Sequence, residues 1–311
     1  MKIEQPYLTL VATNKCNYRC FYCSPDGHGG MGEGFGVKND EPELEDLVLK
    51  SRLAESMGTK KIRVTGGEPT LIPWLPELLQ ELGKGSSELS VATNGFLQKR
   101  DFGRAKVRIS LDTIIPEDYR STCGAGDLAR VLESVFELRD MGVLDRIACV
   151  VTNRNYPNVS GYLRWAIDND LSVKFFDLYA TVLTKDQWVS EYADIGSFDS
   201  LLQLIGGVPR QIGYTKSFGI PAKHYDLPNG TYVRVKDSME GTRYGSICGG
   251  CDSYPCQEGL YTVAYADKKL LPCRQGPQYE AGSVEDFVNN LGFLQKVFQR
   301  SYFSRAFWRD K

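Results

Sequence analysis

The chain has 311 residues, of which 42% are hydrophobic and 24% are charged, and its formal net charge is −2. This composition allows a packed core. The sequence has no long run of Lys or Arg, which argues against nucleic-acid binding. No stretch reaches the roughly 18 apolar residues of a membrane-spanning helix, and no apolar signal segment follows Met1. The sequence therefore predicts a cytoplasmic protein that binds neither nucleic acid nor a membrane.

Apolar runs alternate with helical patterns through the first 180 residues. Short apolar runs predict strands at residues 7–13, 61–65, 89–93, 107–111, 146–152 and 173–178. Apolar residues at helical spacing predict helices at about residues 43–57, 74–82, 127–141 and 159–169. Strands joined by helices of this length form parallel α/β sheets. Six such units predict a partial (β/α)6 barrel, since a closed barrel has eight, with its active site at the C-terminal ends of the strands.

The pattern changes after residue 179. In chain order we expect a helical stretch at 185–206, strands within 211–237 around a turn at 228–230, a hairpin turning at 267–269 and a helical tail at 283–309. We therefore expect two regions, the barrel at 1–180 and a C-terminal extension at 181–311.

Clustered cysteines are the most informative residues of the chain. In a cytoplasmic protein such clusters favour metal ligation over disulfides. Cys16, Cys20 and Cys23 have the spacing C-x3-C-x2-C directly after the first predicted strand, with Tyr22 before the third cysteine. Three thiolates from one loop can bind three irons of a [4Fe–4S] cluster and leave the fourth iron open. A zinc site would need one more ligand, for which His28 is the local candidate.

This spacing resembles the signature of the radical S-adenosylmethionine (SAM) superfamily. In that family the open iron binds the amino and carboxylate groups of SAM. An electron from the cluster then cleaves SAM, and the resulting 5′-deoxyadenosyl radical abstracts a hydrogen atom from the substrate. The resemblance therefore implies a [4Fe–4S] cluster, SAM, a small-molecule substrate and an electron donor such as flavodoxin or ferredoxin.

Segments at the ends of the next three strands are similar to the SAM-binding motifs of this family. Gly66 and Gly67 allow close approach of a ligand to the backbone, and Glu68 can accept a hydrogen bond from an ammonium group. Short polar residues at strand ends often only cap the next helix. Through the resemblance, the expected SAM-binding residues are Gly66, Gly67, Glu68, Thr93, Asn94, Ser110 and Asp112.

Nearly the whole chain resembles the GTP 3′,8-cyclase family of molybdenum-cofactor biosynthesis, notably at residues 65–69, 93–95 and 109–113. That family holds a second cluster near its C-terminus with a C-x2-C motif and a third cysteine after a short hairpin. Cys248, Cys251 and Cys273 match this layout. The resemblance thus implies a second [4Fe–4S] cluster in the C-terminal extension.

Two departures from the cyclase family argue for a different substrate. The family has an Arg near the position of Thr9, and an Arg-rich stretch where residues 257–262 contain no Arg. Bidentate Arg contacts are what a triphosphate site uses. We therefore expect the same scaffold with a substrate other than GTP.

The C-terminal extension also has one more cysteine than the cyclase layout needs, because Cys256 follows Cys251. If all four cysteines bind the second cluster, the cluster can accept an electron and the enzyme is a dehydrogenase. If one thiol is free, it can return a hydrogen atom to a substrate radical, as in the aminoglycoside epimerases that this arrangement resembles. We favour Cys248 as the hydrogen donor, with Cys251, Cys256 and Cys273 as ligands, although simple alignment leaves Cys256 free instead.

The sequence thus favours a radical SAM epimerase that inverts a carbon centre of a polar amino sugar. The alternatives are a dehydrogenase of a similar alcohol, a GTP 3′,8-cyclase-like enzyme and a zinc-binding protein without catalysis.

Overall fold

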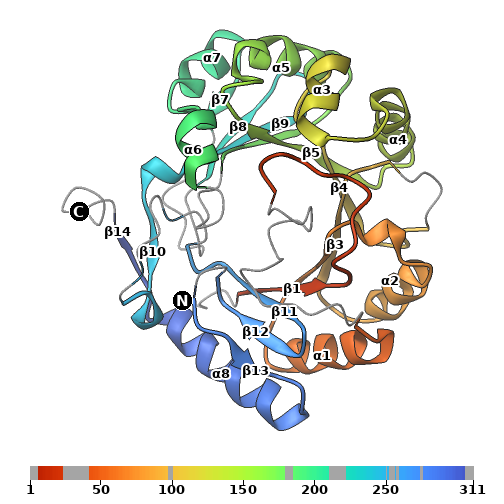
Figure 1. The fold of residues 1–311 in the computed structure, drawn as a ribbon, viewed down its shortest axis with the longest axis vertical. Coiled ribbons are helices and arrows are strands. Elements are labelled where there is room, and N and C mark those ends of the chain that lie inside the picture. The colour runs from red at the N-terminus through yellow and green to blue at the C-terminus, as the bar shows by residue number, and fades with distance from the viewer. Residues whose placement is uncertain are drawn as a thin grey trace.

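A computed structural model describes residues 6–23, 42–96, 101–178, 185–209, 222–249, 251, 256, 259–273 and 276–304. Its centre is a curved, mostly parallel sheet (Figure 1). The first six strands are β1 (Tyr7–Val11), β2 (Lys61–Thr65), β3 (Glu88–Thr93), β4 (Lys106–Ser110), β5 (Leu144–Val151) and β6 (Val173–Asp177). They pair in chain order, each parallel to the next.

Strands from the C-terminal region extend this sheet at both edges. Within the described residues twelve strands form one sheet in the order β13-β12-β11-β1-β2-β3-β4-β5-β6-β9-β8-β7. The added strands are β7 (Val208–Pro209), β8 (Ala222–Asp226), β9 (Tyr232–Lys236), β11 (Thr262–Ala266), β12 (Lys269–Leu271) and β13 (Tyr279–Glu280). A separate pair consists of β10 (Thr242–Tyr244) and β14 (Tyr302–Ser304). Strands from both sides of residue 180 therefore share one sheet.

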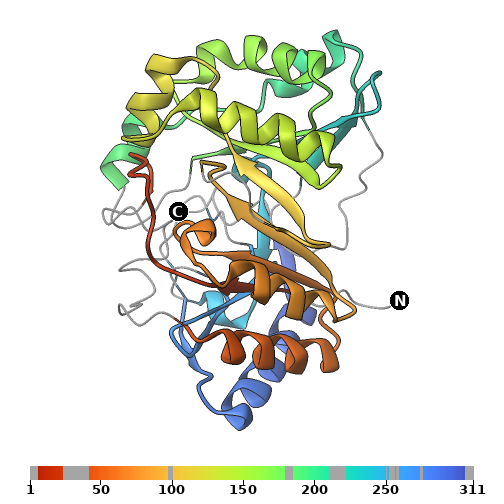
Figure 2. The same ribbon diagram turned by 90° about the vertical axis from the view of Figure 1, so that its right-hand side faces the viewer.

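Helices cover the outside of the curved sheet, while the loop that follows β1 runs along its inside toward α3 (Figure 1). The helices are α1 (Leu44–Ser56), α2 (Leu75–Gly83), α3 (Pro116–Cys123), α4 (Leu128–Asp140), α5 (Val159–Asp168), α6 (Lys185–Glu191), α7 (Phe198–Leu204) and α8 (Val284–Gln299). In the side view α8 lies next to α1 at one end of the molecule (Figure 2). There the buried Lys50 ammonium of α1 donates to the carbonyl oxygens of Gly282 and Ser283, just before α8. None of the helices in the described part of the chain is long and apolar enough to cross a bilayer.

The six strands and four helices expected before residue 180 are all present, with shifts of no more than two residues at most ends. The partial-barrel expectation is thus confirmed for the α/β core. The hairpin expected at 267–269 is also present, because Asp267 and Lys268 both adopt positive φ, as a two-residue hairpin turn requires.

Other expectations from the sequence were wrong. The helical stretch at 185–206 is divided into α6 and α7, and α3 is not among the helices whose bounds the sequence predicts. Within the described part of the tail, α8 ends at Gln299 and residues 302–304 form strand β14 against β10; residues 305–309 of the expected helix lie outside the described residues. A pairing partner distant in sequence decides a strand of this length, so local patterning does not reveal it. Residues 211–221 of the expected strand region lie outside the described part of the chain.

The apolar face of α2 packs this helix against the sheet, and a single substitution tests how much that packing stabilises the fold. Leu75, Leu78, Leu79 and Leu82 recur at helical spacing and are buried. We expect Leu78→Ala to lower the free energy of unfolding by about 2–5 kcal/mol, because it leaves a cavity between helix and sheet. Leu204→Ala, at a side chain that is 84% exposed, should change it by less than about 0.5 kcal/mol. Chemical denaturation measures both, and equal losses would contradict this packing.

Candidate functional site

The loop after β1 carries the three N-terminal cysteines, and backbone hydrogen bonds hold it on two sides. On one side Gly67 N donates to Thr13 O, and Glu68 N donates to Lys15 O, both at 2.8 Å. On the other side Arg19 N donates to the carbonyl oxygen of Cys123 at 2.9 Å, at the C-terminus of α3. The loop is therefore fixed between the end of β2 and the end of α3, over the C-terminal ends of the strands.

Gly66 and Gly67 make the first of these contacts possible. A Cβ atom on Gly66 would lie 2.4 Å from Thr13 O, and one on Gly67 would lie 2.3 Å from Lys15 O. Both distances are shorter than any side chain permits. The sequence predicts close approach to a ligand at these glycines; what the structure contains is close approach to another backbone segment, and their contact with SAM stays a prediction.

The thiols of Cys16, Cys20 and Cys23 are partly exposed on this loop. The Tyr18 N–H points at Cys16 Sγ at 3.4 Å, which is the kind of contact that stabilises the sulfur of a metal-bound thiolate. Burial raises the pKa of the free Cys16 thiol, and a hydrogen bond with Cys123 raises the pKa of Cys20. Among described residues no three His, Cys, Asp or Glu side chains form a group that could hold a metal ion. By residue type the loop offers three thiols, one for each of three irons of a [4Fe–4S] cluster, and their role as cluster ligands stays a prediction. His28, the candidate zinc ligand, lies outside the described residues.

Glu68 connects the ends of β2 and β3. Its carboxylate accepts from Thr70 N at 2.9 Å, from Thr93 Oγ1 at 2.7 Å and from Asn94 N at 2.6 Å. Burial raises the pKa of Glu68 although these hydrogen bonds act in the opposite direction. The side chain of Asn94 in turn donates to Asn17 Oδ1 at 2.8 Å, within the cysteine loop. Three expected SAM-binding residues are thus brought together with that loop.

Asp112, just beyond β4, makes the corresponding connection to Tyr22. The Tyr22 hydroxyl donates to one carboxylate oxygen, and Val150 N donates to the other at 2.8 Å. Burial raises the pKa of Asp112 to about 6, while both hydrogen bonds lower it. Ser110 is exposed at the end of β4. The structure therefore places the expected SAM-binding residues along one edge of the sheet, around the cysteine loop.

Three of the four C-terminal cysteines lie around the buried side chain of Tyr244. Burial raises the pKa of Tyr244, and the nearby thiols of Cys256, Cys248 and Cys251 raise it further. Cys248 Sγ accepts a hydrogen bond from Gly245 N at 3.4 Å. The fourth, Cys273, lies after β12 and raises the pKa of Tyr279, for which burial is the larger cause.

The inner face of the sheet carries basic side chains that the sequence expectations missed. They alternate along the strands with buried apolar residues that face the helices. The pKa of Lys174 is well below its usual value, because it is buried and because like charges lie close to it, those of Lys236, Arg146, Arg63 and Arg108. We call this set of five residues the cationic interior.

Tyr261 shows that members of the cationic interior meet across the barrel. Arg63 Nη1 on β2 donates to the Tyr261 hydroxyl at 3.2 Å. Lys236 Nζ on β9 lies 4.7 Å from the centre of the same ring. Four strands separate β2 from β9 in the sheet, so only its curvature brings both residues to one tyrosine.

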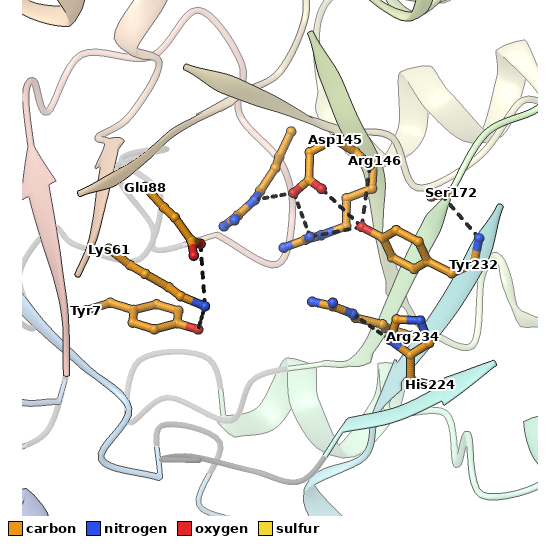
Figure 3. Close-up of polar contacts among 10 residues, drawn as sticks. Tyr7, Lys61, Glu88, Asp145, Arg146, Ser172, His224, Tyr232 and Arg234 are labelled. Atoms are coloured by element: carbon orange, nitrogen blue, oxygen red, sulfur yellow. Dashed lines mark hydrogen bonds and ion pairs between the residues drawn. The ribbon is translucent and has the colours of Figure 1, made fainter. Parts of the chain in front are cut away.

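Further polar side chains lie at the N-terminal ends of the strands. Figure 3 shows Tyr7, Lys61 and Glu88 on one side of the interior, with Asp145, Arg146, Tyr232 and Arg234 on the other. The signal that could have identified this region is the recurrence of basic residues at alternate strand positions. It is present in Lys61 and Arg63, in Lys106 and Arg108, and in Arg234 and Lys236.

Comparisons with known proteins agree with this architecture. Residues 10–155 match the radical SAM superfamily. The fold is similar to that of Streptococcus suis SuiB bound to S-adenosylmethionine, with a TM-score of 0.60 and 15% identity. That match covers 87% of this chain but only 60% of SuiB. The match over residues 10–155 identifies a radical SAM domain, so the chain is a radical SAM enzyme, and that domain implies one [4Fe–4S] cluster and SAM.

Within the superfamily, the sequence is similar to GTP 3′,8-cyclases. It is 27% identical to the GTP 3′,8-cyclase of Alkaliphilus oremlandii, over 96% of this chain and 90% of that protein. It is 34% identical to the probable GTP 3′,8-cyclase of Archaeoglobus fulgidus, over 44% of this chain and 45% of that protein.

The cysteine loop gives a direct test of the cluster assignment. We expect the triple variant Cys16→Ala/Cys20→Ala/Cys23→Ala, reconstituted anaerobically, to lose the iron bound by this loop and all reductive cleavage of SAM. Cys149→Ala removes a buried thiol of β5 and should retain both. Iron analysis and chromatography of 5′-deoxyadenosine measure the outcome, and SAM cleavage by the triple variant would refute the assignment.

Proposed function

We propose that this radical SAM enzyme acts on a nucleoside triphosphate, with GTP as the first candidate. The observation that carries the proposal is the cationic interior, since it concentrates positive charge inside the barrel on the side chains of five strands. The similarity to GTP 3′,8-cyclases over most of both chains supports GTP in particular.

Electrostatics explains why the cationic interior favours a polyanion. Like charges in a partly desolvated space repel one another, and the pKa of Lys174 is lowered first by burial and then by that repulsion. A phosphate chain would relieve the repulsion and form charge-assisted hydrogen bonds with the guanidinium groups. The Nε atom of Arg146 is buried and has no hydrogen-bond partner within the described part of the chain, so a phosphate oxygen that reached it would supply the missing acceptor.

The two departures from the cyclase family do not remove this positive charge. Thr9 Oγ1 lies 2.7 Å from Thr262 Oγ1, so this position joins β1 to β11 through hydroxyl groups. The basic side chains come instead from β2, β4, β5, β6 and β9. The sequence-based expectation of a substrate other than GTP considered only Thr9 and residues 257–262, and we replace it with the present proposal.

In this proposal the chain's own residues divide into two groups. A bound [4Fe–4S] cluster and SAM supply the 5′-deoxyadenosyl radical that abstracts a substrate hydrogen. Glu68 and Asp112 hold the strand ends against the cysteine loop and so fix where that chemistry occurs. The cationic interior binds and orients the phosphate chain below it. We further propose that the C-terminal cysteines hold a second [4Fe–4S] cluster and that a flavodoxin or ferredoxin supplies the electron.

The GTP proposal can be tested by nucleotide-dependent turnover and by removing one cation. With anaerobic enzyme, 5′-deoxyadenosine should accumulate well above background when GTP is present. Arg146→Gln should weaken GTP binding about tenfold to hundredfold, since a hydrogen bond to a charged group contributes about 1.5–3 kcal/mol. Lys84→Gln, on the outer surface at the end of α2, should bind GTP like the unmodified protein.

Two results would count against the proposal that this enzyme binds a nucleoside triphosphate. If iron-loaded enzyme forms no additional 5′-deoxyadenosine with GTP, ATP, CTP or UTP, the proposal fails. A loss of affinity in Lys84→Gln equal to that in Arg146→Gln would show that the effect is not specific to the barrel interior.

A second candidate function is epimerisation, which the additional C-terminal thiol favours. Cys248 accepts from Gly245 N and lies with Cys251 and Cys256 around Tyr244. If three cysteines bind the second cluster, one thiol can return a hydrogen atom to a substrate radical. A polycationic amino sugar would be repelled by the cationic interior, so an epimerase with this interior is better matched to a phosphorylated sugar.

Deuterated water distinguishes epimerisation from the other reactions. Because a thiol exchanges its hydrogen with solvent, the product of an epimerase should carry one deuterium at the inverted carbon. Cys248→Ala should still form 5′-deoxyadenosine but no inverted product, whereas Cys256→Ala should lose iron. Mass spectrometry and iron analysis measure these results. The reverse pattern would exchange the two roles, and an oxidised product without deuterium would indicate the dehydrogenase.

A further inference from the structure

Asp145 is a carboxylate placed among the cations of the barrel interior. Its Oδ2 atom accepts from Arg146 Nη1 at 2.6 Å and from Arg108 Nε at 3.0 Å. Its Oδ1 atom accepts from the Tyr232 hydroxyl at 3.1 Å. Figure 3 shows Asp145 between the side chains of Arg146 and Tyr232. One carboxylate thus takes two arginine donors that would otherwise be available to an anionic ligand.

A bulge in β5 explains how Asp145 reaches this position. Val107 pairs with Leu144, but the next residue of β4, Arg108, pairs with Arg146, so Asp145 has no residue opposite it on β4. In a regular strand Asp145 would share the face of Ile147, which is buried toward the helices. A bulge changes the direction of the extra side chain, and here the carboxylate contacts two inward-facing arginines.

The charge of Asp145 is held in place by its neighbours. Burial alone would raise its pKa, but the positive charges of Arg146 and Arg108 and the hydrogen bonds from Arg108 and Tyr232 lower it. The carboxylate is therefore ionised at neutral pH. It offsets part of the positive charge of the cationic interior before any substrate binds.

We propose that Asp145 is a specificity-determining residue, which sets how much negative charge the barrel interior accepts from the phosphate chain of a substrate. The inference rests on the proposed function, because it assumes that the cationic interior binds phosphate. With Asp145 ionised, a ligand phosphate must share Arg108 and Arg146 with a fixed carboxylate. The repulsion between that carboxylate and the ligand grows with the ligand's charge, so longer phosphate chains are disfavoured more than shorter ones.

Inorganic pyrophosphate and tripolyphosphate test this inference without a nucleobase. We expect both to bind the iron-loaded protein in calorimetric titrations at low salt. Asp145→Asn removes the charge with almost no change in shape. It should tighten tripolyphosphate binding by roughly tenfold and pyrophosphate binding by roughly threefold, because the relief of repulsion increases with ligand charge. Tyr232→Phe, which keeps the carboxylate charge, should preserve the discrimination between the two probes.

Glu88→Gln is the matched control. Glu88 is also a carboxylate at the N-terminal end of a barrel strand, but its side chain is 76% exposed and pairs with Lys61, at 3.5 Å, rather than with Arg108 or Arg146. The same change of net charge there should alter both affinities by less than twofold. An effect equal to that of Asp145→Asn would show that net charge alone matters and would overturn the inference.

Thermal unfolding provides a second measurement in case Asp145→Asn is unstable. In the variant no carboxylate neutralises the positive charge of Arg108 and Arg146. Its Tm should therefore rise more on addition of tripolyphosphate than that of the unmodified protein. If Asp145→Asn weakens both probes equally, Asp145 only positions the arginines and the inference is wrong, while the proposed function survives. If neither protein binds either probe, both the inference and the proposed function fail.

Discussion

Backbone contact between three chain segments is the constraint on which the rest of the site depends. The loop after β1 must lie against the end of β2, where side chains on Gly66 and Gly67 would collide with it. On its other side, Arg19 N and Phe21 N donate to the carbonyl oxygens of Cys123 and Thr122. These are among the last carbonyls of α3, which have no partner inside a helix. One set of hydrogen bonds thus completes the helix end and fixes the cysteine loop.

Two buried carboxylates strengthen this arrangement at an energetic cost. Glu68 and Asp112 lie just beyond the ends of β2 and β4, and burial raises the pKa of each although several donors surround it. The hydrogen bonds therefore offset only part of the desolvation that ionisation entails. What the carboxylates provide is geometry, since each connects one strand end to another segment and through it to the cysteine loop. A polar network of this kind is rigid because every member restricts its neighbours.

The inner face of the sheet also carries buried charge, but there the charges are positive and repel one another. Five basic residues gather there. Burial, and after it the charges of Arg63 and Arg146, lower the pKa of Arg108 to about 10. An arrangement that opposes its own stability is expected where a ligand completes it. Asp145 compensates part of the charge from within, and Tyr261 lies between Arg63 and Lys236. In the function proposed above, the residual positive charge favours an anionic substrate over an amino sugar.

Local sequence patterns determined the α/β core and the cysteine loop. Periodic apolar residues identify β1–β6 and four of the helices, because both kinds of element bury one face and repeat at a short interval. The spacing of Cys16, Cys20 and Cys23 predicts the cluster ligands, since one loop holds all three. The tertiary structure alone decided that β9 and β11 extend the sheet, that residues 302–304 pair with β10, and that Asp145 joins the arginines. Each of these depends on residues far apart in sequence, and curvature of the sheet, which no local pattern encodes, brings them together.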